Sequence, residues 1–126
     1  MIADHARSRI VAIARVLLVL AVLFTMYEMI IPDPVPAPRM VNGDKLLHGL
    51  AFFVLTLLTD MSFPQVRFLV KKLLFLVAFG VVIECVQAYL PWRSADITDF
   101  LADCAGIACY LVPAIASRMA ALLHEG

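Results

Sequence analysis

The sequence is short of charge, and the charge that it has is balanced. Of 126 residues, 16% are charged and the formal net charge is zero. A nucleic-acid-binding surface needs an excess of Lys and Arg, so this balance argues against nucleic acid as a partner. Hydrophobic residues make up 63% of the chain, well above the share in a soluble domain. A soluble chain of this length cannot bury so much apolar surface, and we therefore predict a membrane protein.

Cysteine and catalytic signatures are also scarce. Cys85, Cys104 and Cys109 lie in apolar segments without CxxC spacing, and we interpret them as small packing residues. A disulfide between Cys85 and Cys104 is a minor alternative. The chain has no recognisable nucleophile motif, no Gly-rich phosphate loop and no known phosphatase signature. It also has no internal repeat, which predicts one domain over residues 1–126.

Apolar length predicts an all-α fold, a four-helix transmembrane bundle. The predicted spans lie at about residues 10–31, 44–63, 68–90 and 96–123, each near the ~20 residues that cross the hydrocarbon of a bilayer. Prolines follow the first three spans and cannot continue a helix. The basic and apolar N-terminus is similar to a signal peptide, but the stretch VPAPRM is a poor cleavage site, so we expect an uncleaved first span.

The loops differ in their content of Lys and Arg. With the N-terminus inside, the cytoplasmic side holds Arg7, Arg9, Arg15, Arg67, Lys71, Lys72 and Arg118, against Arg39, Lys45 and Arg93 outside. The positive-inside rule then predicts a multi-pass protein of the bacterial cytoplasmic membrane with both termini in the cytoplasm. We interpret the basic residues between the second and third spans as a topology signal. This topology brings the start of the second span, the end of the third and the start of the fourth to the outer face.

Polar residues gather at this outer face. The candidate ligand-binding residues are Asp44, Lys45, His48, Glu84, Gln87, Arg93, Asp96, Asp99 and Asp103. At about 100° per residue, three sets fall on one stripe each: Asp44 with His48, Glu84 with Gln87, and Asp96 with Asp99 and Asp103. Ionisable residues in spans usually face the interior of a bundle and pair with one another, so we expect the stripes to line one pocket. Gly80 and Gly106 lie on these stripes and favour close approach of the helices.

Simpler roles remain open for several of these residues. Asp44, and Asp96 with Asp99, fit the capping of helix N-termini, and His48 alone fits a hydrogen bond to a carbonyl of a neighbouring helix. Glu84 lies inside the third span after eleven uncharged residues, so it needs a cationic partner or a proton. A purely structural network of ion pairs remains an alternative for the whole group.

Two segments together resemble the VanZ-like family, small membrane proteins named for a glycopeptide-resistance protein associated with reduced susceptibility to teicoplanin. The segments are DKLLHGLAFF, from Asp44, and GVVIECVQAYLPWRSADITDFLADCAG, which ends at Gly106. The shared order is D-K-x-x-H, E-x-x-Q, P-x-R, D, D, G. The matching positions are Asp44, Lys45, His48, Glu84, Gln87, Pro91, Arg93, Asp96, Asp99 and Gly106. The sequence departs at Asp103, where the family usually has Asn, and at Tyr110, where a second small residue is common.

Three functions follow as hypotheses. The first is a non-enzymatic protein whose Lys45 and Arg93 bind an anionic lipid or a lipid-linked cell-envelope intermediate, and which influences teicoplanin susceptibility. The second is a membrane enzyme acting on a lipid headgroup or polyprenyl phosphate, with His48 or Glu84 as acid or base and a hard divalent cation at the aspartates. Ion or proton translocation is the weakest, since only Asp60 lies on the other side. No other cofactor is expected, and the catalytic residues, ligand and oligomeric state stay open.

Overall fold

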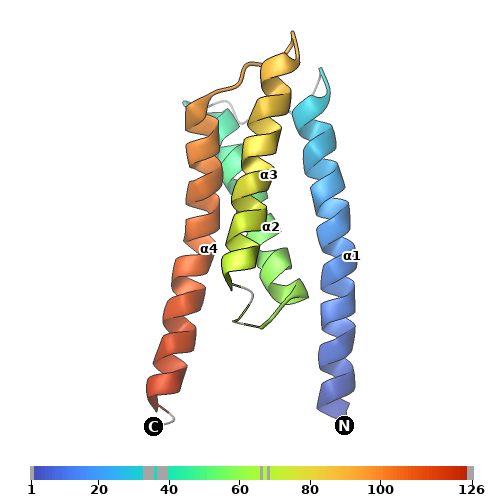
Figure 1. Cartoon of the computed structure of the whole chain (residues 1–126), viewed down its shortest axis with the longest axis vertical. Coiled ribbons are helices and arrows are strands. Elements are labelled where there is room, and N and C mark those ends of the chain that lie inside the picture. Colours follow the sequence, from blue (N-terminus) through green and yellow to red (C-terminus); the bar gives the residue numbers. More distant parts are fainter. Residues whose placement is uncertain (1, 33–35, 37–39, 66, 68, 125–126) are drawn as a thin grey trace.

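The computed structural model describes residues 2–32, 36, 40–65, 67 and 69–124, and its helices run alongside one another in a bundle (Figure 1). The helices are α1 (Ile2–Ile30), α2 (Gly43–Ser62), α3 (Leu69–Tyr89) and α4 (Ile97–His124). The prediction of an all-α fold is confirmed, and the described part of the chain contains no strand. The predicted start of the third span, Phe68, lies outside the described residues. Helix α1 begins well before residue 10, because the polar residues that precede its apolar part are also helical.

The outer surface of the bundle is apolar. Helices α1, α2 and α4 are long and apolar enough to cross a membrane, and α3, with 21 residues, is as long as α2 with its 20. Large apolar side chains on these helices, such as Leu20, Phe24, Leu74 and Val112, are more than half exposed. In a bilayer they would contact acyl chains, where exposure of apolar groups carries no penalty. The chain is thus built as a membrane protein.

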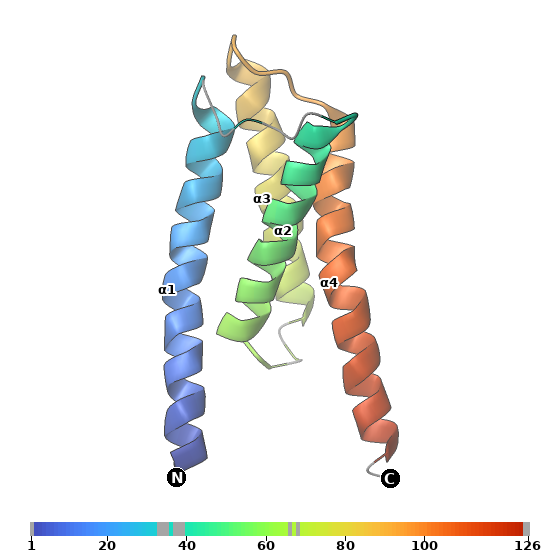
Figure 2. The same ribbon diagram turned by 180° about the vertical axis from the view of Figure 1, so that it is seen from behind.

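The bundle has two distinct ends. Both termini lie at one end, which we call the terminal end, and the starts of α2 and α4 lie at the opposite, distal end (Figures 1 and 2). Helix α2 packs most extensively against α4, and α1 packs against α2 and α3. The prediction that the first turns of α2 and α4 and the last turns of α3 share one end of the bundle is therefore confirmed.

Two glycines bring α2 and α4 into backbone contact. A Cβ atom added at Gly106 would lie 2.1 Å from the carbonyl oxygen of Gly49, so a larger residue cannot occupy this position without separating the helices. The apolar core consists of Phe52, Leu55, Leu76, Ile83, Ile107 and Leu111, and all of these except Ile83 lie on the terminal side of this contact. The polar residues at the distal end are held on a scaffold that is tightly packed directly beneath them.

Candidate functional site

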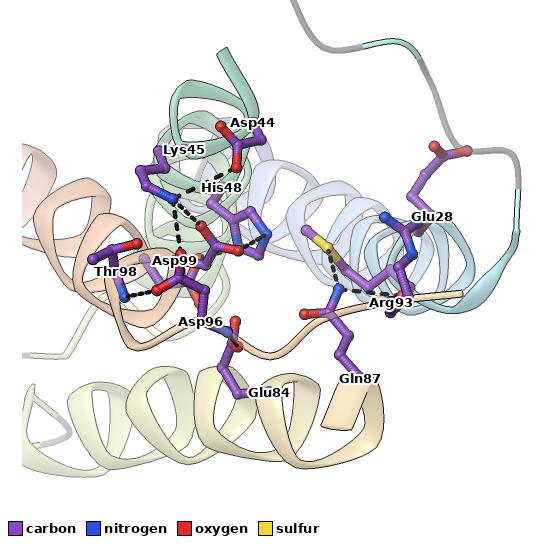
Figure 3. Close-up of polar contacts among 12 residues, drawn as sticks. Glu28, Asp44, Lys45, His48, Glu84, Gln87, Arg93, Asp96, Thr98 and Asp99 are labelled. Carbon is purple, nitrogen blue, oxygen red and sulfur yellow. Dashed lines mark hydrogen bonds and ion pairs between the residues drawn. The ribbon is translucent and has the colours of Figure 1, made fainter. Parts of the chain in front are cut away.

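Seven ionisable side chains meet at the distal end between α2, α3 and α4 (Figure 3). We call them the polar cluster: Asp44, Lys45, His48, Glu84, Asp96, Asp99 and Asp103. The first three come from the first turns of α2 and Glu84 from α3, while Asp96 immediately precedes α4 and Asp99 and Asp103 lie in its first two turns. Spacings of three and four residues place the side chains of α2 and α4 on facing sides of the two helices.

Lys45 lies at the mouth of the polar cluster and is surrounded by acids. Its Nζ atom lies 2.8 Å from Asp99 Oδ1, 3.3 Å from Asp96 Oδ2 and 3.5 Å from Asp44 Oδ2 (Figure 3). A quarter of the Lys45 side chain, 25%, remains exposed. The ammonium group is thus shared among three carboxylates and still reaches the surface of the bundle.

Asp96 and Asp44 differ in their relation to the helix starts. The Oδ1 atom of Asp96 accepts a hydrogen bond from the backbone N–H of Thr98 at 2.8 Å, as a capping residue does. This bond, and to a lesser extent Lys45, holds the pKa of the Asp96 carboxyl below its usual range. The N-cap of α2 is Asn42, with φ 60°, so the capping interpretation of Asp44 is wrong. Asp44 lies in the first turn and pairs with Lys45 instead.

His48 and Asp103 form a buried pair beneath Lys45. The Nδ1 atom of His48 lies 2.9 Å from Asp103 Oδ1, and its Nε2 atom lies 3.9 Å from Asp99 Oδ2. Asp103 has no exposed surface, at 0%. The partners of His48 are thus carboxylates, and the simpler interpretation that it bonds a backbone carbonyl is wrong.

Glu84 completes the inner part of the polar cluster from the side of α3. Its Oε2 atom accepts a hydrogen bond from the backbone N–H of Asp96 at 3.1 Å. Its Oε1 atom and the Oδ2 atom of Asp103 are both buried and have no hydrogen-bond partner among the described residues. One ligand atom each from His48, Glu84 and Asp103 can be chosen so that all three lie within 4.8 Å of one another, a spacing suited to holding a metal ion.

Gln87 and Arg93, which the sequence placed in the same pocket, lie beside the polar cluster instead. Gln87 Nε2 donates to the carbonyl oxygen of Met29 at 3.2 Å. Arg93, which lies next to Glu28 in Figure 3, donates to the carbonyl oxygen of Glu28 and to that of Ile31, the latter at 3.1 Å. Because Gln87 and Arg93 lie one turn or more beyond Glu84 along the chain, they contact the C-terminal end of α1 instead of the polar cluster. Gln87 and Arg93 thus link the C-terminal end of α1 to α3 and to the segment that follows α3.

A second group of polar residues lies toward the terminal end, and we call it the Asp60 network. Asp60 Oδ1 accepts from Lys72 Nζ at 2.7 Å, while Oδ2 accepts from the Tyr110 hydroxyl at 3.0 Å and from Arg118. Lys72 is 4% exposed, so it is a buried partner of Asp60 as well as a basic residue beside the loop. Sequence reasoning missed this network, although opposite charges within three apolar segments at similar depth were a usable signal.

The comparisons with known proteins identify one family. The model of the VanZ/LLP1 family matches residues 13–117, which is most of the chain and includes every residue of the polar cluster. No curated protein and no solved structure matches the chain. The family match agrees with the resemblance carried by the D-K-x-x-H and E-x-x-Q segments.

Proposed function

The chain belongs to the VanZ/LLP1 family, and we propose that its polar cluster binds the headgroup of an anionic lipid or of a lipid-linked cell-envelope intermediate. We place the protein in the bacterial cytoplasmic membrane with both termini in the cytoplasm, so that the distal end is the outer face. Bound there, such a lipid would be less accessible to other molecules of the envelope. The protein would in this way influence envelope properties and susceptibility to teicoplanin.

The position of Lys45 is the observation that carries this proposal. Lys45 lies in the first turn of α2, at the end of a helix apolar enough to span a membrane. Lipid phosphates lie at the depth where spanning helices end, so the partly exposed ammonium group is within their reach. Of the two cations first considered, the proposal rests on Lys45, because Lys45 lies at the mouth of the polar cluster whereas Arg93 lies beside the cluster, on carbonyls at the end of α1.

Lipid retention by the purified protein tests the proposal. Native mass spectrometry would compare phosphatidylglycerol and undecaprenyl phosphate with zwitterionic phosphatidylcholine. We expect the wild type to retain the two anionic lipids, and Lys45→Met to weaken their retention about tenfold, as loss of a charge-assisted hydrogen bond would. The control is Lys71→Met, which removes an exposed lysine near the terminal end. Equal retention of all three lipids by the wild type and Lys45→Met would contradict the proposal.

The proposed effect on the envelope needs a cellular test. Expression of the wild type in a teicoplanin-sensitive bacterium should change the inhibitory concentration of teicoplanin. Lys45→Met, produced at the same level in the membrane, should not. An equal change with both proteins would separate the resistance effect from lipid binding at Lys45.

A membrane enzyme is the second candidate, and the pair of His48 and Asp103 favours it. A buried carboxylate 2.9 Å from an imidazole nitrogen orients the ring as in a general base. With water as the co-reactant, such an enzyme would hydrolyse a polyprenyl phosphate to the polyprenol and inorganic phosphate, or a phospholipid headgroup phosphodiester to an alcohol and a phosphomonoester. His48→Gln would abolish formation of these products while the protein stays folded. Absence of turnover on these substrates would leave lipid binding as the function.

Ion or proton translocation receives no support from the arrangement of the core. Phe52, Leu76 and Ile107 are at most 3% exposed and lie, on their own helices, between residues of the polar cluster and of the Asp60 network. An apolar layer of this kind separates the two polar groups. A continuous polar path would have to cross it.

A further inference from the structure

We propose that His48, Glu84 and Asp103 form a binding site for a single divalent transition-metal ion, with Zn²⁺ as the representative ion. The three residues come from α2, α3 and α4, so the ion would join the three helices at the distal end. This site goes beyond the lipid binding proposed above, because it needs only the side chains of the chain itself.

The geometry of the three side chains comes close to that of a metal site. Their ligand atoms lie within 4.8 Å of one another, and His48 Nδ1 is already 2.9 Å from Asp103 Oδ1. A tetrahedral Zn²⁺ with bonds of about 2.0 to 2.2 Å holds its ligand atoms about 3.4 Å apart. Side-chain rotation would close the set, and Glu84 is held among the described residues by one hydrogen bond, from the backbone N–H of Asp96.

A buried oxygen without a hydrogen-bond partner among the described residues is an independent reason to expect a ligand at this place. Asp103 is fully buried, and its Oδ2 atom has no partner among the described residues. Gly80 faces this oxygen, since a Cβ atom added there would lie 3.3 Å from it. A buried carboxylate oxygen without a donor is unfavourable, and the adjacent Glu84 Oε1 is in the same condition. A bound cation would satisfy both atoms.

The charges of the polar cluster also leave room for a cation. The polar cluster contains five acids but, in the described part of the chain, two basic side chains, Lys45 and His48. Asp96 and Asp99, two of the aspartates that the sequence suggested for a cation, already contact Lys45. Glu84 and Asp103 are left with His48 alone. Two positive charges at this point would balance the two inner carboxylates.

The donor set selects the class of metal. An imidazole nitrogen with two carboxylates suits Zn²⁺, Mn²⁺ or Fe²⁺, whereas Mg²⁺ and Ca²⁺ prefer oxygen ligands alone. Three protein ligands leave at least one coordination position for an oxygen from outside. Under the proposed function, a lipid phosphate would supply this outside oxygen, and this part of the inference rests on the proposed function.

Titration of the full chain with Zn²⁺ tests the site. The protein would be purified in detergent, stripped with EDTA, dialysed and titrated with Zn²⁺ alone by calorimetry, with metal content measured by mass spectrometry. We expect one saturable ion per chain. Asp103→Asn and Glu84→Gln should each weaken binding by at least about 100-fold, since even residues outside the ligand set of a metal site change affinity 10- to 100-fold.

The matched control is Glu28→Gln, which makes the same acid-to-amide change at the distal end but outside the polar cluster. It should bind Zn²⁺ like the wild type. Circular dichroism would confirm that each variant is folded, and Zn²⁺ should raise the melting temperature of the wild type and Glu28→Gln but not of Asp103→Asn. No saturable binding by the wild type, or equal binding by all four proteins, would overturn the site.

Lipid retention measured in EDTA separates this inference from the proposed function. Phosphatidylglycerol retained in EDTA by a protein that does not bind Zn²⁺ would overturn the metal site and leave lipid binding intact. Zn²⁺ binding in detergent without retention of any anionic lipid would support the metal site and contradict the proposed function.

Discussion

The polar cluster and the Asp60 network use similar side chains but balance them differently. In the Asp60 network, one carboxylate receives Lys72, Arg118 and the Tyr110 hydroxyl, and both of its oxygens are satisfied. In the polar cluster, acids outnumber basic residues, and buried oxygens of Glu84 and Asp103 have no described partner. The first arrangement is what a structural ion pair requires. The second leaves bonding capacity for a ligand.

The largest effect on stability should come from disrupting the Asp60 network, in which both carboxylate oxygens are satisfied. Asp60→Asn leaves Lys72, which is 4% exposed, without its carboxylate partner. Removing one partner of a buried ion pair lowers the free energy of unfolding by about 3 to 5 kcal/mol, and we expect a loss of that order. Unfolding in SDS, followed by circular dichroism, would measure it. A loss similar to that of the control Glu28→Gln would mean that the network is not structural.

The next effect concerns the scaffold beneath the polar cluster. Gly106→Ala would place a Cβ atom 2.1 Å from the Gly49 carbonyl oxygen, and separation of α2 from α4 should destabilise the protein by about 1 to 3 kcal/mol. Gly49→Ala is the matched control, because its Cβ would meet only an ordinary contact, 3.5 Å from the Ala102 carbonyl oxygen. Thermal unfolding of the two variants should differ clearly. Equal melting temperatures would argue against the close contact.

A smaller effect is expected from an acid of the polar cluster itself. Asp103→Asn removes one negative charge from a group that has too many, and the amide can still bond His48. We expect the free energy of unfolding to change by less than about 1.5 kcal/mol, the size of a single hydrogen bond. Measured beside Asp60→Asn under the same conditions, this variant compares the two polar groups directly. A loss as large as that of Asp60→Asn would make both groups structural.

The smallest effect should be a pH-dependent one at Asp96. Its pKa is lowered in the folded protein by the bond from Thr98 and by Lys45, so its ionised form adds stability at pH values above the unfolded pKa of about 4. This contribution is lost as the pH falls through the lower folded pKa. Asp96→Asn should therefore be slightly less stable than the wild type at pH 7, and the difference should vanish in acid. A difference independent of pH would assign the effect to capping alone.

Much of the fold could be predicted because apolar length and proline position determine where spanning helices begin and end. The predicted starts of the second and fourth spans agree with α2 and α4 to within one residue. Helix α1 extends beyond the predicted span toward the N-terminus, and apolar length carries no information about such a polar extension. Its start at Ile2 depends on helix propensity in a stretch that bears several charges.

The polar cluster could be predicted in part, for a similar reason. Helical phase placed Asp44 with His48, and Asp99 with Asp103, because residues four apart lie on the same side of a helix. These two stripes meet in the structure, where His48 contacts Asp103. Lys45 was assigned to the same end by topology. Phase did not separate Glu84 from Gln87, which point to different neighbours one turn apart. That distinction depends on the packing of α1 against α3, which no periodicity within a single segment reports.

The bonds at the C-terminal end of α1 also have a consequence for the order of assembly. The last carbonyls of a helix lack partners within it, and here the donors are Gln87, Trp92 and Arg93. These residues leave the ribosome about sixty residues after the carbonyls that they contact. The last turn of α1 therefore acquires these partners only after α2 and α3 have been synthesised, so α1 is made well before its C-terminal carbonyls can be satisfied by them.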